Sequence, residues 1–145
     1  KMKRSGCFLL DYGIESGSER ILASMGKRFS RERGSAILRH ASKQGIRNIC
    51  NLIIGYPGET RADIEESRGF LKENAACLDG VSLHLFKLGA GSAIFENPAA
   101  FNVENMRIPE GKSDIRFFYY AFDERGGLKW DAKMKQTKYL KLNIV

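Results

Sequence analysis

The first 90 residues repeat one pattern three times: an apolar strand, a turn that contains glycine, and an amphipathic helix. The predicted strands cover residues 6–12, 48–55 and 80–88, and the predicted helices cover residues 20–25, 30–44 and a segment from residue 60 onward. Strands that alternate with helices of this length form right-handed βαβ units. The pattern therefore predicts an α/β protein with a parallel sheet.

Residues at the helix ends support the two longer helices. Ser30 is a good N-cap, and Gly45 suits the position after the last turn of the same helix. Thr60 and Asp63 form a T-x-x-D capping box at the start of the following helix. These local signals agree with the spacing of the strands.

The last third of the chain is less regular. We expect a loop with one helical turn over residues 97–112, a strand or a buried helix over 114–130, and an exposed helix over 131–145. A chain of 145 residues has room for one domain with a core and is short for two. We therefore predict a single domain, 1–145, in which residues 1–90 form three β/α units and residues 91–145 form a C-terminal extension.

The glycine-containing turns would all lie at the carboxyl end of the sheet, where parallel α/β folds bind ligands. Glu15 and Asn51 are polar residues at or near the ends of apolar strands, and Lys27 follows the first short helix. A carboxylate and an amide at this edge can bind sugar hydroxyls, and the lysine can bind a carboxylate or a phosphate. In the alternative interpretation the glycines serve the turns alone, and Glu15 is a solvated acid at a helix start.

Common catalytic motifs do not match this sequence. In "GIESG" the serine is one place late for a nucleophile elbow, and "GYPGET" lacks the lysine of a phosphate-binding loop. His40 is expected on a helix and His84 in a strand, and neither has a cysteine or aspartate at ligand spacing. We assign no catalytic residue and no metal ligand to the chain.

Cysteine spacing and charge limit the class of protein further. The three cysteines are too far apart for a zinc site or a disulfide framework, so we expect free thiols in a reducing cytoplasm. Neither a signal peptide nor the run of about 20 apolar residues of a membrane span is expected. Residues 1–47 carry 11 basic and 4 acidic residues, which favours an anionic ligand there, or else a solvated surface.

Three motifs, "GIESGSERIL", "MGK" and "IIGYPGET", follow one another at a specific spacing. With them, residues 5–90 resemble the second half of the radical S-adenosylmethionine (SAM) core, and most of all the cobalamin-associated radical SAM proteins described as Fe–S oxidoreductases. The resemblance implies a partial, half TIM-like barrel with about three parallel β/α units. It also implies a function as part of an enzyme that cleaves SAM reductively to start radical chemistry.

The resemblance assigns SAM contacts to matched positions of this chain. Glu15 is expected near the ribose with Ser16 beside it, and Asn51 where the family often has a second ribose contact. Lys27 closes the "MGK" motif and is expected at the methionine carboxylate.

The adenine side of SAM is assigned to the third motif. Ile53 and the backbone from Gly55 to Pro57 fall where the family holds the adenine. We expect the ribose, carboxylate and adenine contacts to lie at one edge of the sheet.

The sequence departs from the family in its cluster motif. The CxxxCxxC loop that holds a four-iron four-sulfur cluster is not found, and neither is a "GGE"-like turn for the methionine amino group. We therefore expect the cluster in a longer parent only, and this chain alone to be inactive. The sequence leaves open whether the parent also uses cobalamin. The expected partners are the missing N-terminal half of the domain, a substrate that the sequence does not identify, or a second copy paired through the exposed edge of the first strand.

Two other functions remain open. A fragment of an RNA-modifying radical SAM methylthiotransferase would use the lysine-rich tail with Trp130 and Tyr139. That tail lacks the repeated aromatic platform of a single-strand binder, so nucleic acid ranks below a small-molecule ligand. The third possibility is a phosphate-binding half-barrel of another enzyme family, with the anion at the turn 55–60.

Overall fold

The computed structural model describes residues 1–109 and 119–143, and for residues 136 and 139–143 it describes the backbone alone. The chain forms two compact units. The N-terminal unit comprises Lys1–Ile54 and Glu59–His84, and the C-terminal unit comprises Gly55–Gly58 and Leu85–Val145. The single domain 1–145 expected from the sequence stays a prediction.

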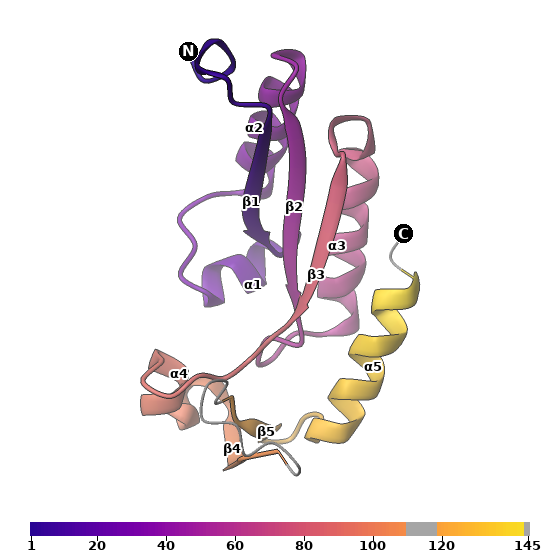
Figure 1. Cartoon of the computed structure of the whole chain (residues 1–145). Coiled ribbons are helices and arrows are strands. Elements are labelled where there is room, and N and C mark those ends of the chain that lie inside the picture. Colours follow the sequence, from indigo (N-terminus) through magenta and orange to yellow (C-terminus); the bar gives the residue numbers. More distant parts are fainter. Residues whose placement is uncertain (110–118, 144–145) are drawn as a thin grey trace. The chain divides into compact units, whose positions relative to one another are not determined.

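The sheet of the N-terminal unit has three strands in the order β1-β2-β3. They are β1 (Leu9–Glu15), β2 (Arg47–Ile54) and β3 (Gly80–Leu85). Figure 1 shows them side by side and running in the same direction, and β1 pairs with β2 in parallel register from Leu9↔Arg47 to Gly13↔Asn51. The prediction of an α/β fold with three parallel strands is confirmed.

Three helices and one short 3₁₀ turn connect these strands, and a second 3₁₀ turn precedes β1. They are η1 (Lys3–Ser5), α1 (Glu19–Ser24), α2 (Arg31–Lys43), α3 (Arg61–Glu73) and η2 (Ala75–Cys77). Ser30 caps α2 by accepting a hydrogen bond from the Arg33 amide, and Thr60 and Asp63 form the predicted capping box of α3. The first strand begins at Leu9 and not at residue 6, because Gly6 adopts a left-handed conformation that ends η1.

The core of the N-terminal unit follows the alternation of β2. Cys50, Leu52 and Ile54 are buried, whereas Asn51 and Ile53 between them are half-buried on the opposite face. Leu38 of α2 and Phe70 of α3 are fully buried. Period-two burial of this kind places one face of each strand in the core and leaves the other face available for polar groups.

The C-terminal unit contains a small antiparallel sheet and the last helix. Its elements are α4 (Ala93–Glu96), η3 (Pro98–Phe101), β4 (Val103–Arg107), β5 (Ala121–Glu124) and α5 (Trp130–Asn143). Strands β4 and β5 pair from Val103↔Glu124 to Arg107↔Ala121. Part of the expected loop 97–112 is thus a strand, and part of the ambiguous segment 114–130 is a strand as well.

The last helix forms as predicted, but one side of its first turns is buried. Trp130, Lys133 and Thr137 are buried, and the Trp130 ring lies 5.6 Å from the Phe122 ring. The side chain of Tyr139 lies outside the described residues. None of the described helices combines the length and the apolarity that crossing a bilayer requires.

Candidate functional site

Glu15 ends β1 in an unusual backbone conformation. Its φ is 70°, and the register of β1 on β2 shifts between Gly13 and Glu15. A left-handed conformation costs a residue with a Cβ about 1 kcal/mol. Strain of this kind in a residue other than glycine is typical of a functional position.

The strained residue is paired with a lysine that the sequence also singled out. Lys27 Nζ lies 3.2 Å from Glu15 Oε1, and both side chains remain partly exposed. A Cβ at Gly13 would lie 2.6 Å from the same Oε1 atom, so a larger residue there would displace the Glu15 carboxylate from this position. The structure therefore brings Glu15 and Lys27 together over Gly13.

Asn51 lies beside Gly13 on the neighbouring strand. Its Nδ2 donates to Asp11 Oδ1 at 2.5 Å, and Asp11 and Gly13 occupy alternate positions of β1. Asp11 was not among the predicted site residues. The signal for it was an acidic residue in an apolar strand, two positions before Gly13 and therefore on the same face as Gly13.

The opposite face of β2 carries a cysteine. Cys50 is fully buried, and burial raises the pKa of its thiol to about 12, with the charges of Glu15 and Asp11 adding to the shift. A thiol with this pKa stays protonated at neutral pH and is a poor metal ligand.

Ser16 is buried within the turn that follows β1. Its hydroxyl lies 3.3 Å from Ser67 Oγ and accepts a hydrogen bond from the Ser18 amide at 3.1 Å. A Cβ at Gly17 would lie 2.6 Å from Ser67 Cα, so the turn packs directly on α3. The Ser16 hydroxyl thus holds the turn, and its predicted place beside the ribose stays a prediction.

Asp63 of α3 holds the residues that follow this turn. Its carboxylate accepts hydrogen bonds from Ser18 Oγ at 2.7 Å, from the Thr60 amide at 2.8 Å and from Arg20 Nε at 3.2 Å. Burial alone would raise the pKa of Asp63, but hydrogen bonds from Arg20, Thr60 and Ser18 outweigh it and hold that pKa well below its ordinary value. The sequence identified Asp63 as a capping residue and missed its contacts with Ser18 and Arg20.

The remaining predicted residues follow Asn51 along the chain. Ile53 lies two positions further on β2, half-buried on the same face as Asn51. Gly55 and Pro57 are buried in the C-terminal unit, in a turn where Gly55 has a φ of 86° and Gly58 a φ of 75°.

The cysteines of the chain do not fit an iron–sulfur cluster. Cys7 precedes β1, Cys50 is buried in β2, and Cys77 lies in η2. Over residues 1–109 and 119–143, no three His, Cys, Asp or Glu side chains come together in a group that could hold a metal ion. The polar groups on the β1–β2 face are carboxylates, which accept hydrogen bonds, an amide, and an ammonium group, which donates them. Such groups suit the binding of hydroxyls and of a carboxylate.

Comparison with known proteins places the chain in a family. Residues 1–71 match the sequence model of the Radical SAM superfamily. An uncharacterised methyltransferase of Pyrococcus horikoshii is 38% identical over 72 residues, which cover 50% of this chain and 16% of the relative. The tRNA-2-methylthio-N(6)-dimethylallyladenosine synthase of Clostridium botulinum is 29% identical over 104 residues, which cover 70% of this chain and 23% of the relative.

A third relative is the ribosomal protein uS12 methylthiotransferase of Chlorobium phaeobacteroides, which is 38% identical over 69 residues. The match covers 46% of this chain and 16% of that protein. The chain thus spans less than a quarter of the length of each of these three relatives. Residues 1–71 thus form a part of a radical SAM domain.

Proposed function

We propose that the face of the sheet carrying Asp11, Glu15, Lys27 and Asn51 binds the ribose and the methionine carboxylate of SAM. The observation that carries this proposal is the strained Glu15, whose carboxylate meets Lys27 over Gly13. The exposed Glu15–Lys27 pair contributes less than about 1 kcal/mol, so a ligand can separate the two groups at small cost.

Ligand binding exchanges the partners of these groups. The methionine carboxylate takes the place of Glu15 at the Lys27 ammonium. The Glu15 carboxylate then accepts hydrogen bonds from the ribose hydroxyls, and the Asn51 amide supplies a further donor. In the superfamily, SAM supplies a carbon-centred radical after it accepts an electron from an iron–sulfur cluster.

The adenine is assigned separately to Ile53 and to the turn from Gly55 to Pro57. An apolar side chain followed by backbone N–H and C=O groups suits a flat heterocycle with polar edges. Cobalamin stays a prediction, because none of the described contacts bears on it.

The test compares two ligands that differ by the amino-acid group, which carries a carboxylate and an ammonium group. S-adenosylhomocysteine carries the amino-acid carboxylate, and 5′-methylthioadenosine lacks it. Lys27→Met is expected to weaken S-adenosylhomocysteine binding about tenfold or more and to leave 5′-methylthioadenosine unchanged, as measured by calorimetry or NMR titration. Arg28→Met is the matched control, because Arg28 is the exposed neighbour with the same charge.

Two results would contradict the proposal. One is equal weakening of both ligands by Lys27→Met, and the other is binding of neither ligand to the unmodified chain. A phosphate ion bound at the turn 55–60 without any nucleoside binding would favour the half-barrel of another enzyme family.

A second candidate is a part of a radical SAM methylthiotransferase, favoured by relatives that modify tRNA or ribosomal protein uS12. Lys133 is buried, so this lysine of the tail is not available to bind RNA. RNA binding that falls steeply with salt and depends on the exposed Lys129, Lys135 and Lys138 would support this candidate.

We also propose that a further β/α unit packs beside β1. In the described part of the chain β1 pairs only with β2, and a groove of about 700 Å³ lies between its outer side and α2. Residues lining this groove include Met2, Leu10, Tyr12, Ala36, Ile37 and His40. The Tyr12 hydroxyl is buried without a hydrogen-bond partner among the described residues.

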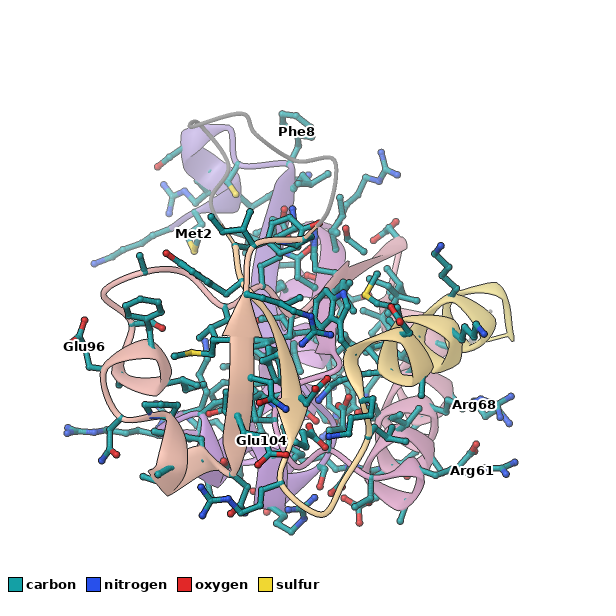
Figure 2. The ribbon with its side chains drawn as sticks, turned by 90° about the horizontal axis from the view of Figure 1, so that it is seen from below. Met2, Phe8, Arg61, Arg68, Glu96 and Glu104 are labelled. Carbon is teal, nitrogen blue, oxygen red and sulfur yellow. The ribbon has the colours of Figure 1, made fainter. Side chains whose placement is uncertain are left out.

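The remainder of a radical SAM domain would supply a strand, a helix and an acceptor for that hydroxyl. Met2 and Phe8, labelled in Figure 2, are also exposed in this unit, by 53% and 68%. Light scattering is expected to show association of the chain that Ile37→Asp abolishes and Ile108→Asp does not. A monomer at every concentration would count against the edge as an interface.

A further inference from the structure

A buried ion pair of the C-terminal unit holds both sides of the turn Gly55–Gly58. Lys133 of α5 and Glu124 of β5 are 4% and 8% exposed and form a salt bridge. Lys133 Nζ also donates to the Tyr56 carbonyl at 3.1 Å, and Glu124 Oε1 accepts from the Gly58 amide at 2.9 Å. The two opposite charges thus bind the two kinds of backbone group in the same turn.

The packing around the ion pair leaves the turn little freedom. A Cβ at Gly55 would lie 3.2 Å from Leu85 Cδ1 and 3.4 Å from Lys133 Cε. The Tyr56 ring is buried and lies 5.2 Å from the Phe86 ring, edge to face. The turn is therefore fixed through its backbone and also through the one large side chain that it carries.

Fold stability alone does not explain two charges in this place. Replacing a buried ion pair with apolar residues of similar volume is often neutral or stabilising, because desolvation of the charges is costly. What apolar residues cannot do is bind a carbonyl and an amide at once. Charge-assisted hydrogen bonds of this kind fix a backbone in one conformation.

We propose that Lys133 and Glu124 are positioning residues for nucleoside binding, which hold the turn 55–58 ready for the adenine. The inference rests on the proposed function, which assigns the adenine to this turn. A turn already held in its binding conformation loses less entropy when the ligand arrives. The C-terminal unit then contributes to the affinity for the adenine through Lys133 and Glu124, which do not touch the adenine themselves.

The test removes the charges and keeps the volume. The double variant Glu124→Met/Lys133→Met is expected to fold with an unchanged or higher Tm. Its affinity for 5′-methylthioadenosine is expected to fall about tenfold, since the turn is no longer held. The ratio of the affinities for S-adenosylhomocysteine and 5′-methylthioadenosine stays the same, because the Lys27 contact is intact.

The matched control is an ion pair of the same unit that does not touch the turn. Lys129 Nζ lies 3.6 Å from Glu104 Oε1, and their side chains are 64% and 33% exposed. Glu104 is labelled on β4 in Figure 2. Glu104→Met/Lys129→Met makes the same change in composition and is expected to leave both affinities unchanged.

Amide hydrogen exchange gives a readout that needs no ligand. Exchange at Gly58 is expected to be at least tenfold faster in Glu124→Met/Lys133→Met, while the amides within α5 stay protected. Unchanged exchange at Gly58, or unchanged 5′-methylthioadenosine affinity in this folded double variant, would overturn the inference. If the unmodified chain binds neither ligand, the proposed function fails and the nucleoside role fails with it, whereas faster exchange at Gly58 still shows that the pair holds the turn.

Discussion

Two neighbouring strands, β1 and β2, end in turns that are held in different ways. The turn at Ser16–Ser18 is held by hydroxyl groups and by the direct packing of Gly17 on α3. The turn at Gly55–Gly58 is held by the buried pair of Lys133 and Glu124. The first support comes from residues that match the radical SAM family, and the second comes from residues beyond the match. Residues beyond the family match thus hold one of the two turns, and residues within the match hold the other.

The largest expected effect comes from breaking the buried pair on one side. Lys133→Met leaves the Glu124 carboxylate buried without its cation, which is expected to lower the free energy of unfolding of the C-terminal unit by about 3–5 kcal/mol. Trp130 is the only tryptophan and is buried in α5, so its fluorescence in a urea titration reports on this unit. An equally large loss of unfolding free energy in Lys129→Met, at an exposed lysine, would show that the effect of Lys133→Met does not depend on burial of the charge.

The next largest effect is expected from a change in the packing of the turn at Ser16–Ser18. Gly17→Ala forces a Cβ to within 2.6 Å of Ser67 Cα and is expected to lower the free energy of unfolding of the N-terminal unit by about 2 kcal/mol. Gly69→Ala is the control, because Gly69 lies within α3 beside only a flexible Arg31 side chain. That change is expected to stabilise the helix by about 0.5–1 kcal/mol. Circular dichroism would follow the unfolding of both variants. Equal changes in the free energy of unfolding would contradict the close packing of Gly17 on α3.

The third effect depends on pH. The pKa of Asp63 is lower in the folded chain than in the unfolded one, so its contribution to stability is fully present above about pH 4 and is lost as pH falls through the folded pKa. Asp63→Asn is expected to cost about 1.5 kcal/mol at neutral pH and to make the acid-induced loss of stability less steep. Urea titrations of both proteins from pH 7 to pH 2 check this. If the free energy of unfolding falls with pH equally in both proteins, Asp63 does not cause the loss of stability in acid.

The smallest effect has the opposite sign. Glu15→Gly relieves the left-handed strain and removes a weak ion pair, so the N-terminal unit is expected to gain up to about 1 kcal/mol while ligand affinity falls. Asn102→Gly, at another left-handed position, is the control and is expected to change stability little, because asparagine tolerates this conformation. A loss of stability in Glu15→Gly would contradict the account of Glu15 as a strained residue.

Local patterns in the sequence predicted most of the N-terminal unit. Alternating apolar residues, the Ser30 cap and the Thr60–Asp63 capping box each act within a few residues, and all are present in the structure. The pairing of Glu15 with Lys27 agrees with the expectation that these residues lie together. Their contact with SAM stays a prediction.

Contacts between distant residues could not be predicted in this way. Ser67 binds the turn after β1 from α3, and Lys133 binds the Tyr56 carbonyl from α5. No periodicity links such residues, and a lysine in a polar helix gives no sign that it will be buried. The aromatic run within residues 114–130 also did not distinguish a strand from a helix, because both can bury aromatic side chains.

The order of the two units along the chain has a practical consequence. The chain leaves the first unit after Ile54, returns at Glu59 and leaves again after His84, so no single cut separates the units. A protein shortened after His84 would keep nearly the whole parallel sheet but would lose Glu124 and Lys133. Studies of the turn Gly55–Gly58 in such a shortened protein would describe the turn without the two side chains that hold its backbone.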